Sequence, residues 1–160
     1  MIAIIPARGG SQRIKLKNLR VLAGHPLLAY RIAAAKASGC CNEILVATDE
    51  DAIARRGTEY GARILMRQPS AADEPDIAWL RLAVRIFEPH ALIGLLRPTA
   101  PFLTGHCVAL AMRRFQAEPG AHSLRLIRRV REHPGKMWMV QRYERMVPLL
   151  PFWTRTGDDR

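Results

Sequence analysis

A turn rich in glycine and in cations follows the first apolar run of the chain. The apolar run covers residues 2–5, and Gly9 and Gly10 come shortly after it. Four cations flank the glycines, namely Arg8, Arg13, Lys15 and Lys17. No acidic residue precedes Glu43. Glycine lets a backbone approach a ligand closely, while successive N–H groups and cationic side chains hold phosphate oxygens. The combination is typical of a site for a polyphosphate.

The turn does not match two common phosphate-binding motifs. It has no Gly-Lys-Ser/Thr at the spacing of a P-loop, and it does not read Gly-x-Gly-x-x-Gly. A surface turn with solvated cations would contain the same residues. On these residues alone, both interpretations stay open.

A longer stretch around the turn resembles a known enzyme family. Residues 5–19 read Ile-Pro-Ala-Arg-Gly-Gly-Ser-x-Arg-Ile-x-x-Lys-Asn-Leu, and Leu-Ala-Gly-His-Pro-Leu-Leu-Ala-Tyr follows at residues 22–30. Both segments resemble the opening of the acylneuraminate cytidylyltransferases, the CMP-sialic acid synthetase family. One difference is Gln12, where many members carry lysine. The resemblance implies an enzyme that joins CTP and a nine-carbon, sialic-acid-like (nonulosonic) sugar acid into a CMP-sugar, releasing pyrophosphate, with Mg²⁺ as cofactor.

The resemblance also implies where the ligands bind. The nucleotide-binding residues would be Ala7, Arg8, Gly9, Gly10, Ser11, Arg13, Lys17, Asn18 and Arg67. Arg8 and Lys17 would be catalytic, because this chemistry depends on neutralising charge on phosphate oxygens. Residues 97–101 read Arg-Pro-Thr-Ala-Pro and resemble a family motif that borders the substrate pocket. Arg97 and Thr99 are therefore candidate substrate ligands, as is Lys136 in a His-Pro-Gly-Lys-Met-Trp segment that also resembles the family.

Apolar runs and helical periodicities alternate along the chain. Strands are expected at residues 2–5, 43–47, 62–66, 91–96 and 123–127. Helices are expected from residues 24–26 to 38–39, from 76 to 87, and after a capping Thr104. The pattern predicts an α/β, three-layer, Rossmann-like fold of the nucleotidyltransferase type with a mainly parallel sheet. The segment 91–96 is the most apolar, which predicts a central strand.

Asp49 directly follows the second expected strand. With Thr48 it could cap the next helix, because a carboxylate or hydroxyl there accepts the free N–H groups of the first turn. An aspartate at the end of a strand is also a metal-ligand position in many α/β enzymes. The helix cap is the favoured interpretation of Asp49, and a magnesium ligand is the alternative.

Composition restricts the classes of partner. The chain has 160 residues, 49% of them hydrophobic, which predicts one domain over residues 1–160. A net charge of +11 favours anionic ligands. Nucleic acid is not expected, because the cluster Arg125, Arg128, Arg129 and Arg131 lacks interleaved aromatic residues. No apolar run has the length of a membrane helix, and three cysteines without metal spacing suit a reduced, cytoplasmic protein.

The resemblance covers almost the whole chain but only the front part of the family's enzymes. It implies that a carboxylate pair that binds the catalytic metal, and further strands and helices, would follow in a longer chain. The expectation is therefore a domain that lacks the family's C-terminal part and whose transfer activity is impaired. The resemblance also implies a homodimer with contacts after about residue 124.

Two other interpretations remain. A Kdo-type sugar cytidylyltransferase would share the opening strand and turn, but it carries an acidic residue in the motif that corresponds to residues 97–101. A basic nucleotide- or nucleic-acid-binding module, or an inactive remnant of an enzyme, would share the net charge. A steep fall of affinity with salt would indicate nucleic acid, whereas selectivity for CTP over ATP would indicate the cytidylyltransferase pocket.

Overall fold

The fold is seen in a computed structural model, which describes residues 1–11, 13–68, 80–81, 84–88, 90–127, 138–140 and 146–148. The chain divides into two compact units, Met1–Leu124 and Arg125–Arg160, and each is described by itself. The single domain expected over residues 1–160 stays a prediction. Among the described residues, no helix combines the length and the apolar character needed to cross a membrane.

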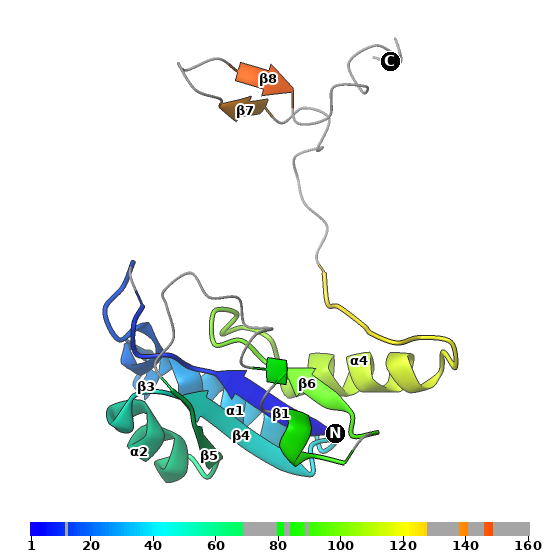
Figure 1. Ribbon diagram of the computed structural model, residues 1–160, viewed down its shortest axis with the longest axis horizontal. Coiled ribbons are helices and arrows are strands. Elements are labelled where there is room, and N and C mark those ends of the chain that lie inside the picture. Colours follow the sequence, from blue (N-terminus) through cyan, green and yellow to red (C-terminus); the bar gives the residue numbers. More distant parts are fainter. Residues whose placement is uncertain are drawn as a thin grey trace. The chain divides into compact units, whose positions relative to one another are not determined.

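A four-stranded parallel sheet forms the centre of the first unit (Figure 1). Its strands are β1 (Ile2–Pro6), β4 (Glu43–Thr48), β5 (Arg63–Met66) and β6 (Ile93–Leu95). Their order is β5-β4-β1-β6, so β1 pairs with both β4 and β6. The predicted parallel α/β fold is confirmed. The prediction of a central strand at 91–96 is wrong for the described sheet, because β6 borders only β1 there and every residue of β6 is half-buried.

Three helices whose bounds lie within the described residues pack on this sheet. They are α1 (Leu27–Ala37), α2 (Asp51–Glu59) and α4 (Gly105–Gln116). Helix α1 ends at Ser38, and Gly39 follows with a φ of 65°, a left-handed conformation that suits glycine. Thr104 caps α4 as predicted, since its side chain accepts a hydrogen bond from the N–H of Cys107 at 3.3 Å.

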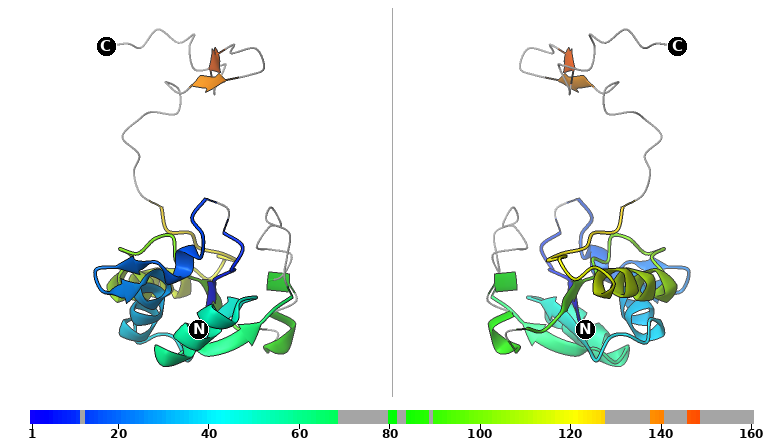
Figure 2. Two further views of the ribbon diagram at one scale, coloured as in Figure 1. Left: turned by 90° about the vertical axis from the view of Figure 1, so that its left-hand side faces the viewer. Right: turned by 90° about the vertical axis from the view of Figure 1, so that its right-hand side faces the viewer.

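The core lies on both faces of the sheet. Alternate residues of β1 face opposite sides, so Ala3 and Ile5 join a cluster with α1, α2 and α4, while Ile4 joins another. Leu80 and Phe87 pack against this second cluster. Figure 2 shows α1 and α4 on one side of the sheet, opposite the short 3-10 helix η2 (Val84–Ile86). Apart from residues 80–81 and 84–87, the helix expected over 76–87 lies outside the described residues.

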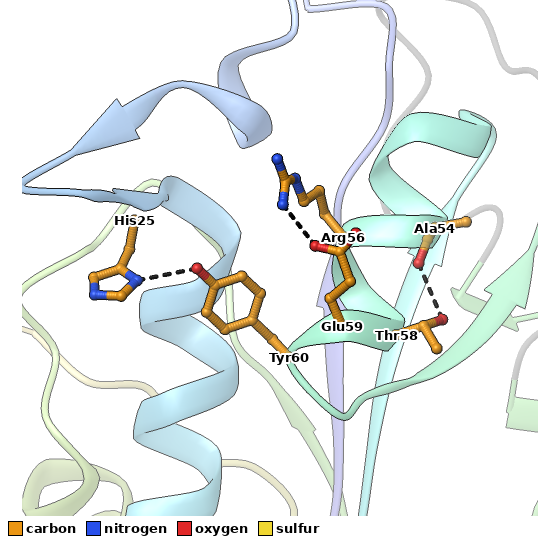
Figure 3. Close-up of polar contacts among 6 residues, drawn as sticks. All are labelled: His25, Ala54, Arg56, Thr58, Glu59 and Tyr60. Carbon is orange, nitrogen blue, oxygen red and sulfur yellow. Dashed lines mark hydrogen bonds and ion pairs between the residues drawn. The ribbon is translucent and has the colours of Figure 1, made fainter.

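A short hairpin precedes α1, where the sequence predicted the start of the helix. Strand β2 (Val21–Leu22) pairs with β3 (His25–Pro26), and Pro26 occupies the N-cap of α1. The hairpin contacts its neighbours through Tyr30, whose hydroxyl donates to the carbonyl of Leu22, and through His25. Figure 3 shows the His25 ring beside Tyr60 at the end of α2, with 3.0 Å between Nδ1 and the hydroxyl oxygen. The hairpin is thereby held against both helices.

The remaining elements are short. The 3-10 helix η1 (Lys17–Leu19) ends the glycine-rich loop. The strand predicted at residues 123–127 is wrong: these residues pair with no described strand, and the Ile127 side chain is 87% exposed. In the second unit, β7 (Trp138–Val140) pairs antiparallel with β8 (Met146–Pro148).

Candidate functional site

Each strand of the parallel sheet delivers a charged residue at its carboxyl end. Arg8 follows β1, Asp49 follows β4, Arg67 follows β5 and Arg97 follows β6. Parallel strands bring these ends to one edge, which is where open α/β sheets place their ligands. Side chains spread over ninety residues of sequence thus meet at one edge.

A pocket of about 210 Å³ lies at this edge. Its lining residues are Pro6, Arg8, Ser11, Lys17, Asn18, Arg67, Arg97, Pro98 and Thr99. Four of these are cations, and none of the described lining residues is acidic. Within the described part of the chain, Arg8 and Lys17 make no ion pair. The pocket is therefore strongly electropositive and suits an anion with several negative charges.

The loop between β1 and η1 forms one wall of the pocket. It leaves the sheet at Ala7, which is fully buried and donates its N–H to the carbonyl of Ala47 at 2.9 Å. The amide nitrogen of Asn18 donates to the carbonyl of Arg8 at 3.1 Å, and Asn18 is only 4% exposed. The two ends of the loop are thus tied together, which fixes the backbone that carries Arg8 and Ser11.

Asp49 makes the second tie to this loop. Its Oδ1 atom accepts the N–H of Gly9 at 2.8 Å, and its Oδ2 atom lies 3.7 Å from Nη2 of Arg67. The Asp49 and Arg67 side chains are 10% and 12% exposed. The carboxylate therefore joins the glycine-rich loop to a cation of the pocket.

The helix cap predicted for Thr48 or Asp49 is wrong. Glu50 occupies the N-cap of α2 and makes no capping hydrogen bond with its side chain. The Thr48 hydroxyl instead accepts the N–H of Glu50 at 3.1 Å, outside the helix. The Asp49 carboxylate accepts the N–H of Gly9 instead.

The two glycines of the loop have different surroundings. A Cβ atom at Gly9 would lie 2.9 Å from Cβ of Glu50, closer than side chains tolerate. At Gly10 a Cβ atom would meet nothing within 4 Å, and the residue is exposed. Gly9 is therefore required by close packing, whereas Gly10 is not.

The structure brings most of the predicted site residues together. Those that line the pocket are Arg8, Ser11, Lys17, Asn18, Arg67, Arg97 and Thr99. Ala7 and Gly9 belong to the loop after β1 but are not lining residues. Gly10 and Arg13 are exposed and do not line the pocket either. Lys136 lies outside the described residues. The contact between Asp49 and Gly9 was not predicted, although the position of an aspartate at a strand end pointed to this edge of the sheet.

Asp49, the candidate magnesium ligand, already has partners among the described residues. No three Asp, Glu, His or Cys side chains gather within the described ranges. Mg²⁺ prefers carboxylates that are free to bind it. Both oxygens of Asp49 are instead engaged, one by the Gly9 N–H and one by the guanidinium of Arg67.

Residues 2–133 match the family model described as Cytidylyltransferase. Among curated proteins, CMP-N,N'-diacetyllegionaminic acid synthase of Legionella pneumophila is 40% identical over 110 residues, covering 64% of this chain and 47% of the relative. N-acylneuraminate cytidylyltransferase of Escherichia coli is 34% identical, covering 72% and 28%. Pseudaminic acid cytidylyltransferase of Campylobacter jejuni is 34% identical, covering 71% and 52%. The chain spans about half, or less, of the length of these relatives.

Solved structures share the fold at lower identity. A CMP:2-keto-3-deoxy-manno-octonic acid synthetase complexed with CTP superposes with a TM-score of 0.65 at 22% identity, covering 74% of this chain and 48% of that one. A cytidylyltransferase from Leptospira borgpetersenii gives a TM-score of 0.63 at 21% identity, covering 74% and 50%. The mainly parallel sheet and its helices thus form a nucleotidyltransferase fold.

Proposed function

The chain belongs to the cytidylyltransferase family, and on that premise we propose that its electropositive pocket binds the triphosphate of CTP for transfer of the cytidylyl group to a sugar acid. One observation carries the proposal: Arg8, Lys17, Arg67 and Arg97 surround a single pocket at the carboxyl ends of the parallel strands. No described acidic residue lines that pocket. A triphosphate is an anion of the charge and length that such a pocket neutralises.

The proposed reaction requires little covalent chemistry from the protein. A sugar hydroxyl forms a new bond to the α-phosphorus of CTP, the bridging bond to the β-phosphate breaks, and pyrophosphate leaves with the electron pair. The hydroxyl proton passes to water. Catalysis then depends on holding the reactants in line and on stabilising the charge that develops on phosphate oxygens. Arg8 and Lys17, which line the pocket, would perform the second task, with Asn18 fixing the backbone that presents Arg8.

We propose a nine-carbon sugar acid as the second substrate. The named relatives act on legionaminic, acylneuraminic and pseudaminic acids, at 34–40% identity. The Kdo-type synthetase shares the fold at 22% identity. Arg97 and Thr99 line the same pocket from the loop after β6. Beside the part of Arg97 in binding the triphosphate, this cation and hydroxyl suit the carboxylate and hydroxyls of the sugar acid.

Three further features belong to the proposal. Mg²⁺ would enter with CTP on the phosphate oxygens, because Asp49 is engaged elsewhere. A homodimer with contacts after about residue 124 would cover exposed apolar side chains there, such as Leu126 at 48% and Ile127 at 87%. The cytoplasm, where CTP is made, would be its compartment. Sedimentation with purified protein tests the dimer.

The enzymatic proposal is tested by release of pyrophosphate. Purified protein is incubated with CTP, Mg²⁺ and one of several nine-carbon sugar acids, with Kdo and with no acid as controls. Release that depends on a nine-carbon acid, together with a CMP-sugar detected by mass spectrometry, supports the proposal. Release with Kdo alone would mean that Kdo, and not a nine-carbon sugar acid, is the substrate. Binding of CTP without release would limit the function of this chain to nucleotide binding.

A further inference from the structure

Helix α1 buries a cation, Arg31, that has no acidic partner among the described residues. Arg31 is 0% exposed, and its Nη2 atom donates to the carbonyls of Pro101 at 2.7 Å and of Leu103 at 2.8 Å. Its Nε and Nη1 atoms have no hydrogen-bond partner among the described residues. No carboxylate of the described part forms an ion pair with it. Burial lowers the pKa of the Arg31 guanidinium.

Packing alone does not explain an arginine at this position. Leu28, Ile32 and Ala35 of the same helix are apolar and buried in the core cluster. A buried charge with unsatisfied donors destabilises a folded protein, and an apolar side chain of similar size is often as stable or more so. The two hydrogen bonds of Nη2 are therefore what an apolar side chain at this position would lack.

Those contacts reach the loop that carries three of the residues lining the pocket. Residues 97–104 connect β6 to α4, and Arg97, Pro98 and Thr99 line the pocket. The loop makes few backbone hydrogen bonds of its own, from Ala100 N to the Arg97 carbonyl at 3.4 Å and from Leu103 N to the Ala100 carbonyl at 3.1 Å. Arg31 donates hydrogen bonds to two carbonyls in the second half of this loop, those of Pro101 and Leu103.

We propose that Arg31 is a positioning residue, which fixes the 97–104 loop so that Arg97 and Thr99 face the ligand. Arg31 is not among the residues that line the pocket, and it acts through the carbonyls of Pro101 and Leu103. The inference rests on the proposed function for the identity of the ligand, CTP. The effect of Arg31 on the loop does not depend on that function. The proposal makes two separate statements about Arg31. The side chain keeps the pocket ordered, and it does not stabilise the fold.

The test compares Arg31→Met, which removes the donors, with Arg31→Lys, whose ammonium can donate to both carbonyls. Arg63→Met is the matched control, since Arg63 makes an exposed ion pair with Glu43. Three readouts are taken: the melting temperature, hydrogen exchange at the amides of Ala100 and Leu103, and the Kd for CTP. In Arg31→Met we expect a melting temperature within about 4 °C of the unmodified protein or above it. Exchange at the two amides should rise about tenfold, and the Kd for CTP should rise about tenfold.

Arg31→Lys should recover part of the exchange protection and part of the affinity, while Arg63→Met should change neither. A fall of more than about 4 °C, or loss of folding, in Arg31→Met would make Arg31 a stability residue and overturn the proposal. Unchanged exchange at Ala100 and Leu103 would overturn it as well. If the unmodified protein did not bind CTP, the proposed function would fail, and the exchange and melting data would still decide the role of Arg31.

Discussion

The backbone N–H of Gly9 donates a hydrogen bond to the Oδ1 atom of Asp49 at 2.8 Å, although forty residues separate the two in sequence. Gly9 belongs to the loop after β1, and Asp49 to the loop after β4. Because these strands are parallel neighbours, their loops leave the sheet side by side. The other oxygen of the carboxylate faces Arg67, so one side chain couples the glycine-rich loop to a second wall of the pocket.

Replacing Asp49 should weaken nucleotide binding without altering the magnesium requirement. Asp49→Ala removes the acceptor of the Gly9 N–H and leaves Arg67 without this charge, so we expect about a tenfold higher Kd for CTP. Asp49→Asn keeps an oxygen for Gly9 and should lose less. Calorimetry over a series of Mg²⁺ concentrations checks both variants. A changed Mg²⁺ dependence in Asp49→Asn would instead identify Asp49 as a metal ligand.

The two loop glycines provide a matched pair of variants. Gly9→Ala places a methyl group 2.9 Å from Cβ of Glu50, so the loop must shift and CTP affinity should fall at least tenfold. Gly10→Ala meets nothing within 4 Å and should bind CTP within about twofold of the unmodified protein. Circular dichroism confirms that both variants fold. Equal losses in the two variants would contradict the assigned packing of Gly9.

Variants of two lysines in the same loop distinguish the effect of contact with CTP from the effect of net charge. Lys17 lines the pocket, whereas Lys15 is exposed and does not. Lys17→Met should raise the Kd for CTP about tenfold, because a hydrogen bond to a charged group contributes about 1.5 kcal/mol or more. Lys15→Met removes the same charge and should change the Kd less than threefold, as expected for a screened surface charge. Equal effects would mean that CTP senses only the overall field.

The outline of the fold could be predicted because parallel sheets leave a clear signal. Residues 2–5 and 44–47 are continuous apolar runs, and both lie in inner strands of the described sheet. The order of strands could not be predicted, because apolar character reports burial and not neighbours. Segment 91–96 is the most apolar, yet β6 borders a single described strand. Residues 123–127 look like a strand but pair with no described one, since pairing depends on partners elsewhere in the chain.

The sequence predicted which residues lie together at the pocket but not the hydrogen bonds that connect them. Family resemblance pointed to Arg8, Lys17 and Arg97, and all three line the pocket. It gave no indication that Asp49 accepts the N–H of Gly9 or that Arg31 supports the 97–104 loop. The burial of Arg31 could not be predicted, because a single sequence does not report which side of a helix another segment covers.

The cysteines should differ in reactivity. Hydrogen bonding with Thr104 in the first turn of α4 lowers the pKa of the Cys107 thiol, whereas burial raises the pKa of the Cys41 thiol. The thiolate is the reactive form, so iodoacetamide at neutral pH should label Cys107 before Cys41. Peptide mass spectrometry over time measures both rates. Faster labelling of Cys41 would contradict these environments.

Cys41 should also affect stability at alkaline pH. Its folded pKa lies above the unfolded value, so the unfolded state releases the proton first. The contribution of Cys41 is therefore complete below the unfolded pKa, near 9.0, and is lost as the pH rises through the folded pKa. Urea unfolding between pH 8 and about pH 10.5 should show a decline that is smaller in Cys41→Ala. An identical decline in both proteins would assign it to other groups.

The measurement closest to the central claim is calorimetric titration of the protein with CTP in the presence of Mg²⁺, beside CMP and ATP. The pocket described by Arg8, Lys17, Arg67 and Arg97 predicts one CTP site per chain, with CMP binding at least tenfold more weakly because it lacks the β- and γ-phosphates. Membership of the cytidylyltransferase family further predicts that CTP binds more tightly than ATP. Equal affinity for CMP and CTP, or no binding of CTP at all, would contradict a triphosphate site in this pocket.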